Sequence, residues 1–102
     1  MTTRILRGAR VDLVDGQRGY NSKQRGLGGR FRRAVDSAVE RILKMPHTPP
    51  LWPNVDPELG VHRYQVKRWP YSIAYMVRRE QIVIVAIAHH RRPPDYWLDR
   101  VH

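Results

Sequence analysis

The chain has no cysteine and no long hydrophobic run, and each absence excludes a class of protein. Without cysteine there is no disulfide bond, no thiol nucleophile and no cysteine-ligated zinc site. The longest apolar run, residues 82–88, is far shorter than the roughly 20 residues that a membrane-spanning helix needs. Residues 1–8 lack the apolar segment of a secretory signal peptide. We therefore expect a cytoplasmic protein with no membrane contact.

Acidic residues are also scarce, because 9 aspartates and glutamates stand against 19 lysines and arginines. The net charge is +10 and the isoelectric point is about 11.1. Only Lys23, Lys44 and Lys67 are lysines, and arginine favours bidentate contact with phosphate or carboxylate. A charge this large on 102 residues favours nucleic acid, a ribosome or an acidic protein as partner. For arginines scattered along helices, the base composition of the genome is an equally good explanation.

The first half of the chain has the pattern of a strand followed by two helices. Residues 3–7 favour a short strand, and apolar residues then recur at helical spacing over residues 9–20. Asp12 and Asp15 lie near the front of that segment, where acids complement the partial positive charge of a helix N-terminus. After a glycine-rich turn, residues 31–44 predict the clearest amphipathic helix. Its apolar stripe consists of Phe31, Val35, Ala38 and Ile42.

The second half has the pattern of three strands after a proline-rich loop over residues 46–60. Residues 61–69 and 71–77 alternate in polarity, whereas residues 81–89 are apolar on both faces, as in a covered central strand. We expect the helices to cover one face of the sheet and a partner chain to cover part of the other. Residues 95–101 are expected to form a short helical turn.

The order β-α-α-β-β-β predicts an α+β fold and one domain over residues 1–102. In that fold a short N-terminal strand and a helical hairpin pack on a small antiparallel sheet, and a short helical turn ends the chain.

The apolar strand ends in a run of histidines and arginines, residues 89–92, with Asp95 and Tyr96 close behind. Histidine moves protons near neutral pH, arginine stabilises negative charge, and tyrosine stacks on a base or transfers a proton. These groups suffice for RNA cleavage without a metal, by attack of the 2′-hydroxyl. The alternative is a hydrogen-bonded core His89 with arginines that contact an acidic partner, and spacing alone favours that alternative.

A metal site or cofactor is not expected. The two histidines of this run are adjacent, so on a strand they point to opposite faces. No HExxH motif or carboxylate cluster accompanies them.

A second basic stretch combines Arg63, Lys67 and Arg68 with Trp69. Basic residues interleaved with aromatics suit RNA, because phosphates pair with the cations and bases stack on the rings. A solvated strand face with edge-protecting charges explains the same pattern equally well.

Together these residues resemble the RelE/ParE superfamily of toxins from type II toxin–antitoxin modules. The matching pieces are Ala9-x-x-Asp12-Leu13, Gly26-Leu-Gly-x-x-Phe31, Arg63–Arg68 running into Trp69–Tyr75, and Ile84–Trp97. The resemblance implies an antiparallel sheet against a helical hairpin, and a growth-inhibiting toxin held inactive by an acidic antitoxin. It also implies that the toxin reaches operator DNA only through the antitoxin complex. RelE-like members cleave mRNA in the ribosomal A site, whereas ParE-like members poison DNA gyrase.

The RelE-like activity implies roles for particular residues. Arg63 falls at a basic strand position, Arg91 at a key arginine after the last strand, and Tyr96 near a C-terminal tyrosine. Gln65 stands where a second lysine is expected, and Ser72 where a phosphate-binding arginine is expected. The predicted catalytic residues are Arg63, His90, Arg91 and Tyr96, and the predicted nucleic-acid-binding residues are Lys67, Arg68, Arg92 and Trp97.

Three hypotheses follow. The leading one is a metal-free endoribonuclease that acts with the ribosome on mRNA, in which His90 or Tyr96 moves protons and Tyr96 or Trp97 stacks a base. The second is a ParE-like inhibitor of DNA gyrase with no enzymatic activity of its own. The third is a toxin fold kept only for interaction or repression, without any effect on growth.

Overall fold

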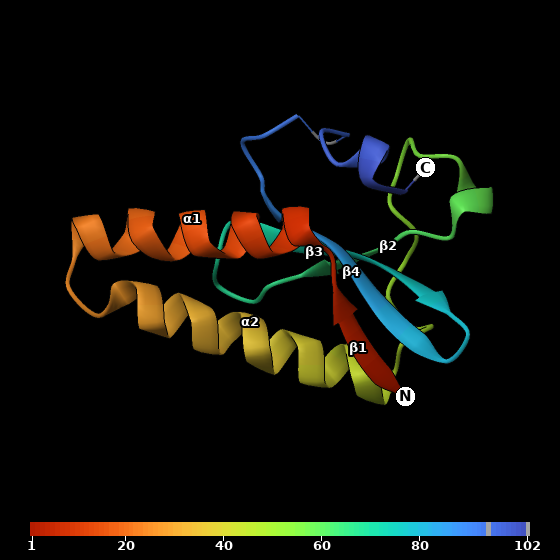
Figure 1. Cartoon of the computed structure of the whole chain (residues 1–102), viewed down its shortest axis with the longest axis horizontal. Coiled ribbons are helices and arrows are strands. Elements are labelled where there is room, and N and C mark those ends of the chain that lie inside the picture. The colour runs from red at the N-terminus through yellow and green to blue at the C-terminus, as the bar shows by residue number, and fades with distance from the viewer. Residues whose placement is uncertain (94, 102) are drawn as a thin grey trace.

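The computed structural model describes residues 1–93 and 95–101. The elements are β1 (Thr2–Ile5), α1 (Arg7–Lys23), α2 (Leu27–Lys44), the 3-10 turn η1 (Pro57–Leu59), β2 (His62–Gln65), β3 (Tyr71–Arg78), β4 (Gln81–His89) and the 3-10 turn η2 (Leu98–Val101) (Figure 1). This order confirms the predicted α+β arrangement. In the described part of the chain, neither helix is long and apolar enough to cross a bilayer.

The four strands form one sheet in the order β1-β4-β3-β2. The β2–β3 and β3–β4 pairs are antiparallel, but β1 runs parallel to β4, with Thr2 opposite Gln81. The sheet is therefore mixed: β2, β3 and β4 form its antiparallel part, as predicted, and β1 adds a parallel strand at one edge. Local polarity patterns identify a strand, but they carry no signal for the direction of a pairing between opposite ends of the chain.

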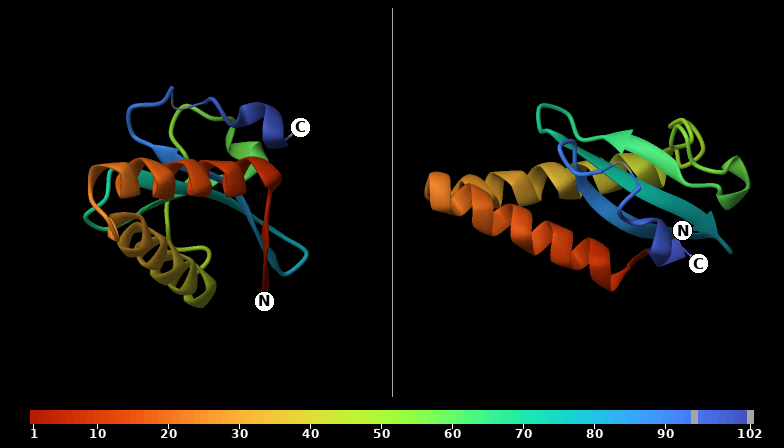
Figure 2. Two further views of the ribbon diagram at one scale, coloured as in Figure 1. Left: turned by 60° about the vertical axis from the view of Figure 1, so that its left-hand side comes forward. Right: turned by 90° about the horizontal axis from the view of Figure 1, so that it is seen from above.

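The helical hairpin of α1 and α2 covers one face of the sheet (Figures 1 and 2). The predicted stripe on α2 is buried throughout, at Phe31, Val35, Ala38 and Ile42. Near the hairpin tip, the ring of Phe31 packs against Tyr71 at a centroid distance of 4.5 Å and Tyr20 packs against Trp69 at 4.9 Å. These aromatic contacts fix the hairpin over β3.

The other face of the sheet is covered by the chain itself. Residues 51–60 and the C-terminal residues 95–101 pack on it, and Figure 1 shows both segments on the side away from α2. Trp52 and Trp97 meet edge to face there, with ring centroids 5.1 Å apart. The expectation that a partner chain covers part of this face is therefore wrong for the area under the two tryptophans. Trp52 is buried in this cover, whereas its neighbour Leu51 is 41% exposed.

β2 ends at Gln65, before the predicted limit of residue 69. The side-chain amide of Gln65 donates to the carbonyl oxygens of Trp69 and Tyr71, at 3.2 and 3.4 Å. Arg68 in this turn has a φ of 72°, in the left-handed region. The chain thus turns at Lys67 and Arg68 instead of continuing the strand.

Candidate functional site

The end of β4 separates two cavities. One, of about 240 Å³, lies between α1 and the sheet, and we call it the helix-side cavity. The other, of about 550 Å³, lies under the loop that carries Trp52, and we call it the loop-side cavity. His89 and Arg92 line both. Two residues of the histidine–arginine run predicted to carry chemistry therefore form the wall between the cavities.

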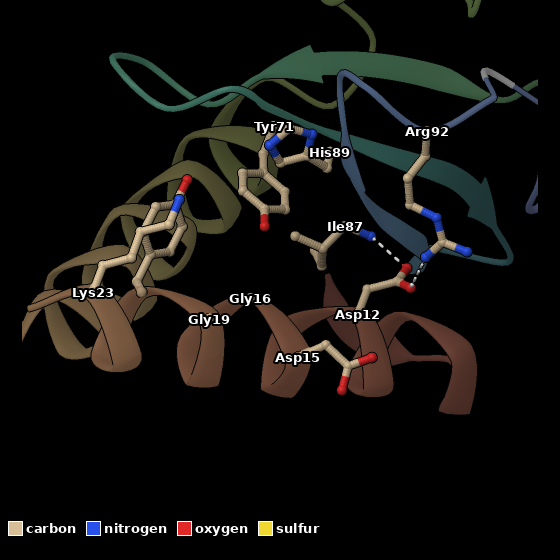
Figure 3. A pocket seen from close by; sticks show the side chains of 10 residues that line it. Asp12, Asp15, Gly16, Gly19, Lys23, Tyr71, Ile87, His89 and Arg92 are labelled. Carbon is tan, nitrogen blue, oxygen red and sulfur yellow. Dashed lines mark hydrogen bonds and ion pairs between the residues drawn. The ribbon is translucent and has the colours of Figure 1, made fainter.

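The helix-side cavity has Asp12 at its inner end, where Figure 3 shows its hydrogen bonds to Ile87 and Arg92. Asp12 Oδ2 accepts from the amide of Ile87 at 3.1 Å, from the Tyr96 hydroxyl at 2.9 Å and from Arg100 Nη1 at 2.8 Å. Its Oδ1 accepts from Arg92 Nη1 and Arg100 Nη2, each at 3.4 Å. Since Asp12 is 6% exposed, these donors compensate for burying its charge.

Sequence reasoning missed this role of Asp12. The predicted helix front was too late: α1 begins at Arg7, so Asp12 lies beyond the first turn. Ala9, Leu13 and Gly16 are buried on the same side of α1. A carboxylate within such a stripe faces the core and needs partners there. The place of Asp12 within the apolar stripe was therefore the feature of the sequence that could have indicated its buried role.

In the loop-side cavity, two of the predicted catalytic residues meet through a serine. Arg63 Nε donates to Ser72 Oγ at 3.2 Å, and Ser72 Oγ lies 3.0 Å from His90 Nε2. The Arg63 guanidinium also lies 5.2 Å from the ring centroid of Trp52, a cation–π contact. Ser72 is fully buried. It thus orients Arg63 and His90 at the position where an arginine was expected from the family resemblance.

Tyr96 and Trp97 do not line the loop-side cavity. The Tyr96 hydroxyl is bound to Asp12, and burial together with that carboxylate raises the pKa of Tyr96 beyond its usual range. Trp97 is 0% exposed. In this conformation the Tyr96 hydroxyl is held away from Arg63 and His90. The buried Trp97 ring offers no face on which a base could stack.

The other predicted residues lie outside this constellation or at its margin. Arg91 is exposed, and its backbone amide donates to His89 Nδ1 at 3.0 Å. Lys67 and Arg68 are exposed in the β2–β3 turn and line neither cavity. The guanidinium of Arg92 lies over the Tyr96 ring, 3.7 Å from its centroid.

His89 and Tyr71 form the wall of the helix-side cavity toward the sheet. Their rings meet edge to face at 4.9 Å. Burial, followed by the nearby charges of Arg91, His90 and Lys23, lowers the pKa of His89. Burial, with smaller contributions from Tyr20, Asp12 and Asp15, raises the pKa of Tyr71 to about 12. At neutral pH both groups are therefore uncharged, and since His89 Nδ1 accepts the Arg91 amide, its ring proton lies on Nε2.

Across residues 1–93 and 95–101, no three histidine, aspartate or glutamate side chains are grouped to hold a metal ion.

Comparison with known proteins gives a family and a fold. The family model described as "ParE toxin of type II toxin-antitoxin system, parDE" matches residues 5–94. A solved structure described as the chromosomal ParDE TA system from P. aeruginosa aligns with a TM-score of 0.65 and 22% identity. The alignment covers 87% of this chain and 95% of that one, which establishes a shared fold. No curated protein matches the chain.

Proposed function

The chain belongs to the ParE family of toxins from type II toxin–antitoxin systems, and we propose that it inhibits DNA gyrase without cleaving RNA. It acts in the cytoplasm as a single domain, and a cognate acidic antitoxin neutralises it. The operator of the module is reached only through the toxin–antitoxin complex.

One observation carries the choice of gyrase over RNA. Metal-free cleavage of RNA needs groups near the scissile phosphate that take up and return a proton. The Tyr96 hydroxyl, which was expected, as the alternative to His90, to move protons, is bound to the buried Asp12 carboxylate. Its raised pKa makes it a poor proton donor near pH 7. Trp97, one of the two predicted stacking residues, lies inside the core.

An acidic antitoxin is supported by the charge of the chain. A net charge of +10 attracts an acidic protein over long range and accelerates its encounter. The similar solved structure is a ParDE toxin–antitoxin system, and here that likeness is extended to the partner.

The test uses two assays on the same purified protein. In the first, gyrase and supercoiled DNA are incubated with it, and trapped double-strand breaks are measured. In the second, primer extension maps cuts in an mRNA held on ribosomes. We expect breaks in the first and no cuts in the second. Growth arrest by the double variant Arg63→Ala/His90→Ala should equal that by the unsubstituted chain.

RNA cleavage remains the second candidate because Ser72 Oγ lies 3.2 Å from Arg63 Nε and 3.0 Å from His90 Nε2. Both Arg63 and His90 line the loop-side cavity. In that mechanism Arg63 and Arg91 stabilise the phosphate, His90 moves the proton, and Lys67, Arg68 and Arg92 hold the RNA backbone. Cuts at the A-site codon that vanish in Arg63→Ala/His90→Ala would establish it and exclude the gyrase proposal. Normal growth on induction would instead leave the third hypothesis, an interaction module.

A further inference from the structure

Four arginines from separate parts of the chain line one cleft of about 570 Å³, on the face of the sheet that lies away from the helices. They are Arg4 of β1, Arg78 of β3, Arg79 of the β3–β4 turn and Arg100 of η2. We call this place the arginine cleft. Its other lining residues are neutral, namely Thr2, Leu6, Met76, Gln81, Val83 and Val101. Cations that converge without a carboxylate among the lining side chains suit an anionic ligand.

Three of these arginines hold their charge available for a ligand. Arg100 is committed to the Asp12 carboxylate at 2.8 Å, so it lines the cleft without offering a free charge. Within the described residues, no carboxylate pairs with Arg4, Arg78 or Arg79. All three are exposed. A ligand in the cleft therefore meets three positive charges that are outside any ion pair of the described chain.

The turn between β3 and β4 brings Arg79 to the cleft at a cost to the backbone. Arg79 and Glu80 are the two turn residues between the paired Arg78 and Gln81, and their φ angles are 51° and 61°, both in the left-handed region. Asparagine and glycine fit such a turn best, and longer side chains are strained there. Arg79 lines the cleft, whereas Glu80 does not. The turn thus presents a cation to the cleft and keeps the adjacent acid out of its lining.

Arg78 is held in position by backbone oxygens. Its Nη2 donates to the carbonyl oxygen of Leu59 at 2.6 Å, and its Nη1 donates to that of Val77 at 3.1 Å. A guanidinium has five N–H donors, so others remain for a ligand. Because the side chain is already ordered, it loses little conformational freedom when it binds.

The lining residues favour the backbone of a nucleic acid duplex over an acidic protein. Met76 and Val83 are buried, so most of the apolar lining is withdrawn from a protein partner that would need apolar anchors. Thr2 and Gln81 lie opposite each other in the sheet, and such neutral polar side chains contact phosphate and sugar oxygens. Within the described residues, no aromatic side chain lines the cleft, so unpaired bases have no ring on which to stack.

We propose that the arginine cleft binds the phosphates of duplex DNA without regard to base sequence. The inference rests on the function proposed above, because gyrase holds duplex DNA when it acts. Arg4, Arg78 and Arg79 each contact a phosphate, and these contacts add to the hold of the toxin on the enzyme–DNA complex. Phosphates carry no sequence information, so the cleft does not recognise the operator, which is still reached through the antitoxin.

The test measures binding of the full-length toxin, without gyrase or antitoxin, to a short labelled DNA duplex by fluorescence anisotropy. A duplex of shuffled sequence should bind equally well. With three phosphate contacts, the logarithm of the association constant should fall with the logarithm of the salt concentration at a slope of about −3. The double variant Arg4→Gln/Arg79→Asn should reduce this slope by about 2, and at about 100 mM salt its Kd should be about tenfold higher or more. Asparagine suits the left-handed backbone at position 79.

The matched control is Arg30→Gln/Arg33→Gln. Both arginines are exposed near the start of α2, and neither lines the cleft. Figure 1 shows the start of α2 and the β3–β4 turn at opposite ends of the molecule. Each double variant removes two charges from the net +10, so a difference between them reports the cleft and not the total charge. We expect the Kd of the control to stay within about threefold of the unsubstituted value, because salt screens distant charges.

The gyrase assay gives a second readout. Arg4→Gln/Arg79→Asn should need more toxin than the control variant does to trap the same number of double-strand breaks. DNA binding that this variant loses, in a toxin that traps no breaks at all, would support the cleft and refute the proposed inhibition of gyrase.

Three results would overturn the inference. Equal Kd values for the two double variants would assign DNA binding to charge spread over the surface. A duplex that does not bind, with breaks still trapped, would remove the cleft and leave gyrase as the target. Poly-aspartate that binds as tightly as the duplex, and only while Arg4 and Arg79 are present, would assign the cleft to an acidic protein.

Discussion

At the scale of single residues, Asp12 joins more of the molecule than any predicted site residue does. Its carboxylate connects α1 to β4 through the Ile87 amide, and to the C-terminal segment through Arg92, Tyr96 and Arg100. Two cations and a hydroxyl converge on one buried anion. Asp12 therefore holds the histidine–arginine turn and the C-terminal cover in place.

Replacing Asp12 with asparagine should lower the free energy of unfolding by about 3 kcal/mol, because the mostly buried Arg100 and the half-exposed Arg92 lose the buried carboxylate with which they pair. Urea denaturation measures this loss. The control is Asp15→Asn, an exposed acid on the same helix, which should change stability by less than about 0.5 kcal/mol. Equal effects of the two substitutions would contradict the role given to Asp12.

The lowered pKa of His89 makes stability depend on pH in the acidic range. The unfolded chain, with the ordinary histidine pKa of 6.5, binds the proton more readily than the folded chain does. The free energy of unfolding should therefore decrease as the pH falls through 6.5 toward the lowered pKa. Urea denaturation across this range should give a shallower dependence for His89→Gln than for the unsubstituted chain. If both proteins showed the same change of unfolding free energy with pH, groups other than His89 would be responsible for it.

At the scale of elements, the helical hairpin depends on a glycine. The amide of Gly28 donates to Asn21 Oδ1 at 2.8 Å, and a Cβ on Gly28 would collide with the carbonyl oxygen of Gln17. α1 and α2 approach this closely because position 28 has no side chain.

Gly28→Ala should therefore destabilise the protein by about 2 kcal/mol, since the helices must move apart. Gly19→Ala is the matched control within the hairpin, because a Cβ there meets nothing within 4 Å. In α1 that substitution should stabilise by about 0.5–1 kcal/mol through helix propensity. Thermal unfolding of the two variants should show shifts of Tm in opposite directions, and shifts in the same direction would contradict the packing described here.

The elements themselves were predictable wherever a periodic pattern determined them. The α2 stripe and the doubly covered β4 follow directly from the spacing of apolar residues. Two features depend on contacts between distant residues and could not be predicted in this way. They are the parallel pairing of β1 with β4, and the edge-to-face contact between Trp52 and Trp97. No local pattern encodes either contact.

For the candidate site, sequence placed Arg63 and His90 in the same region, and the structure links them through Ser72. The sequence did not predict that Tyr96 turns toward Asp12. The spacing between Tyr96 and the histidines does not determine toward which cavity the Tyr96 hydroxyl points. Whether any of these residues acts in catalysis stays a prediction.

At the scale of the whole molecule, the charge of +10 should govern how fast the antitoxin arrives. Salt screens such attraction, so raising the salt from about 50 mM to about 500 mM should slow association by about tenfold or more. The dissociation rate should change much less, because it depends on the buried apolar contacts. Stopped-flow kinetics measures both rates. Association that is independent of salt would exclude electrostatic steering.

The pairing of β1 with β4 also determines when, during synthesis, the toxin can complete its fold. Thr2 leaves the ribosome long before Gln81, which lies opposite Thr2 in the sheet. In the same way, Asp12 leaves the ribosome long before Arg100, which donates a hydrogen bond to the Asp12 carboxylate. Chain synthesis proceeds at about 5–20 residues per second, so for several seconds the nascent chain has its helices and lacks both sheet partner and counter-charge. The folded toxin is completed only near the end of translation. Antitoxin that is already present in the cell can therefore bind the toxin as soon as it folds.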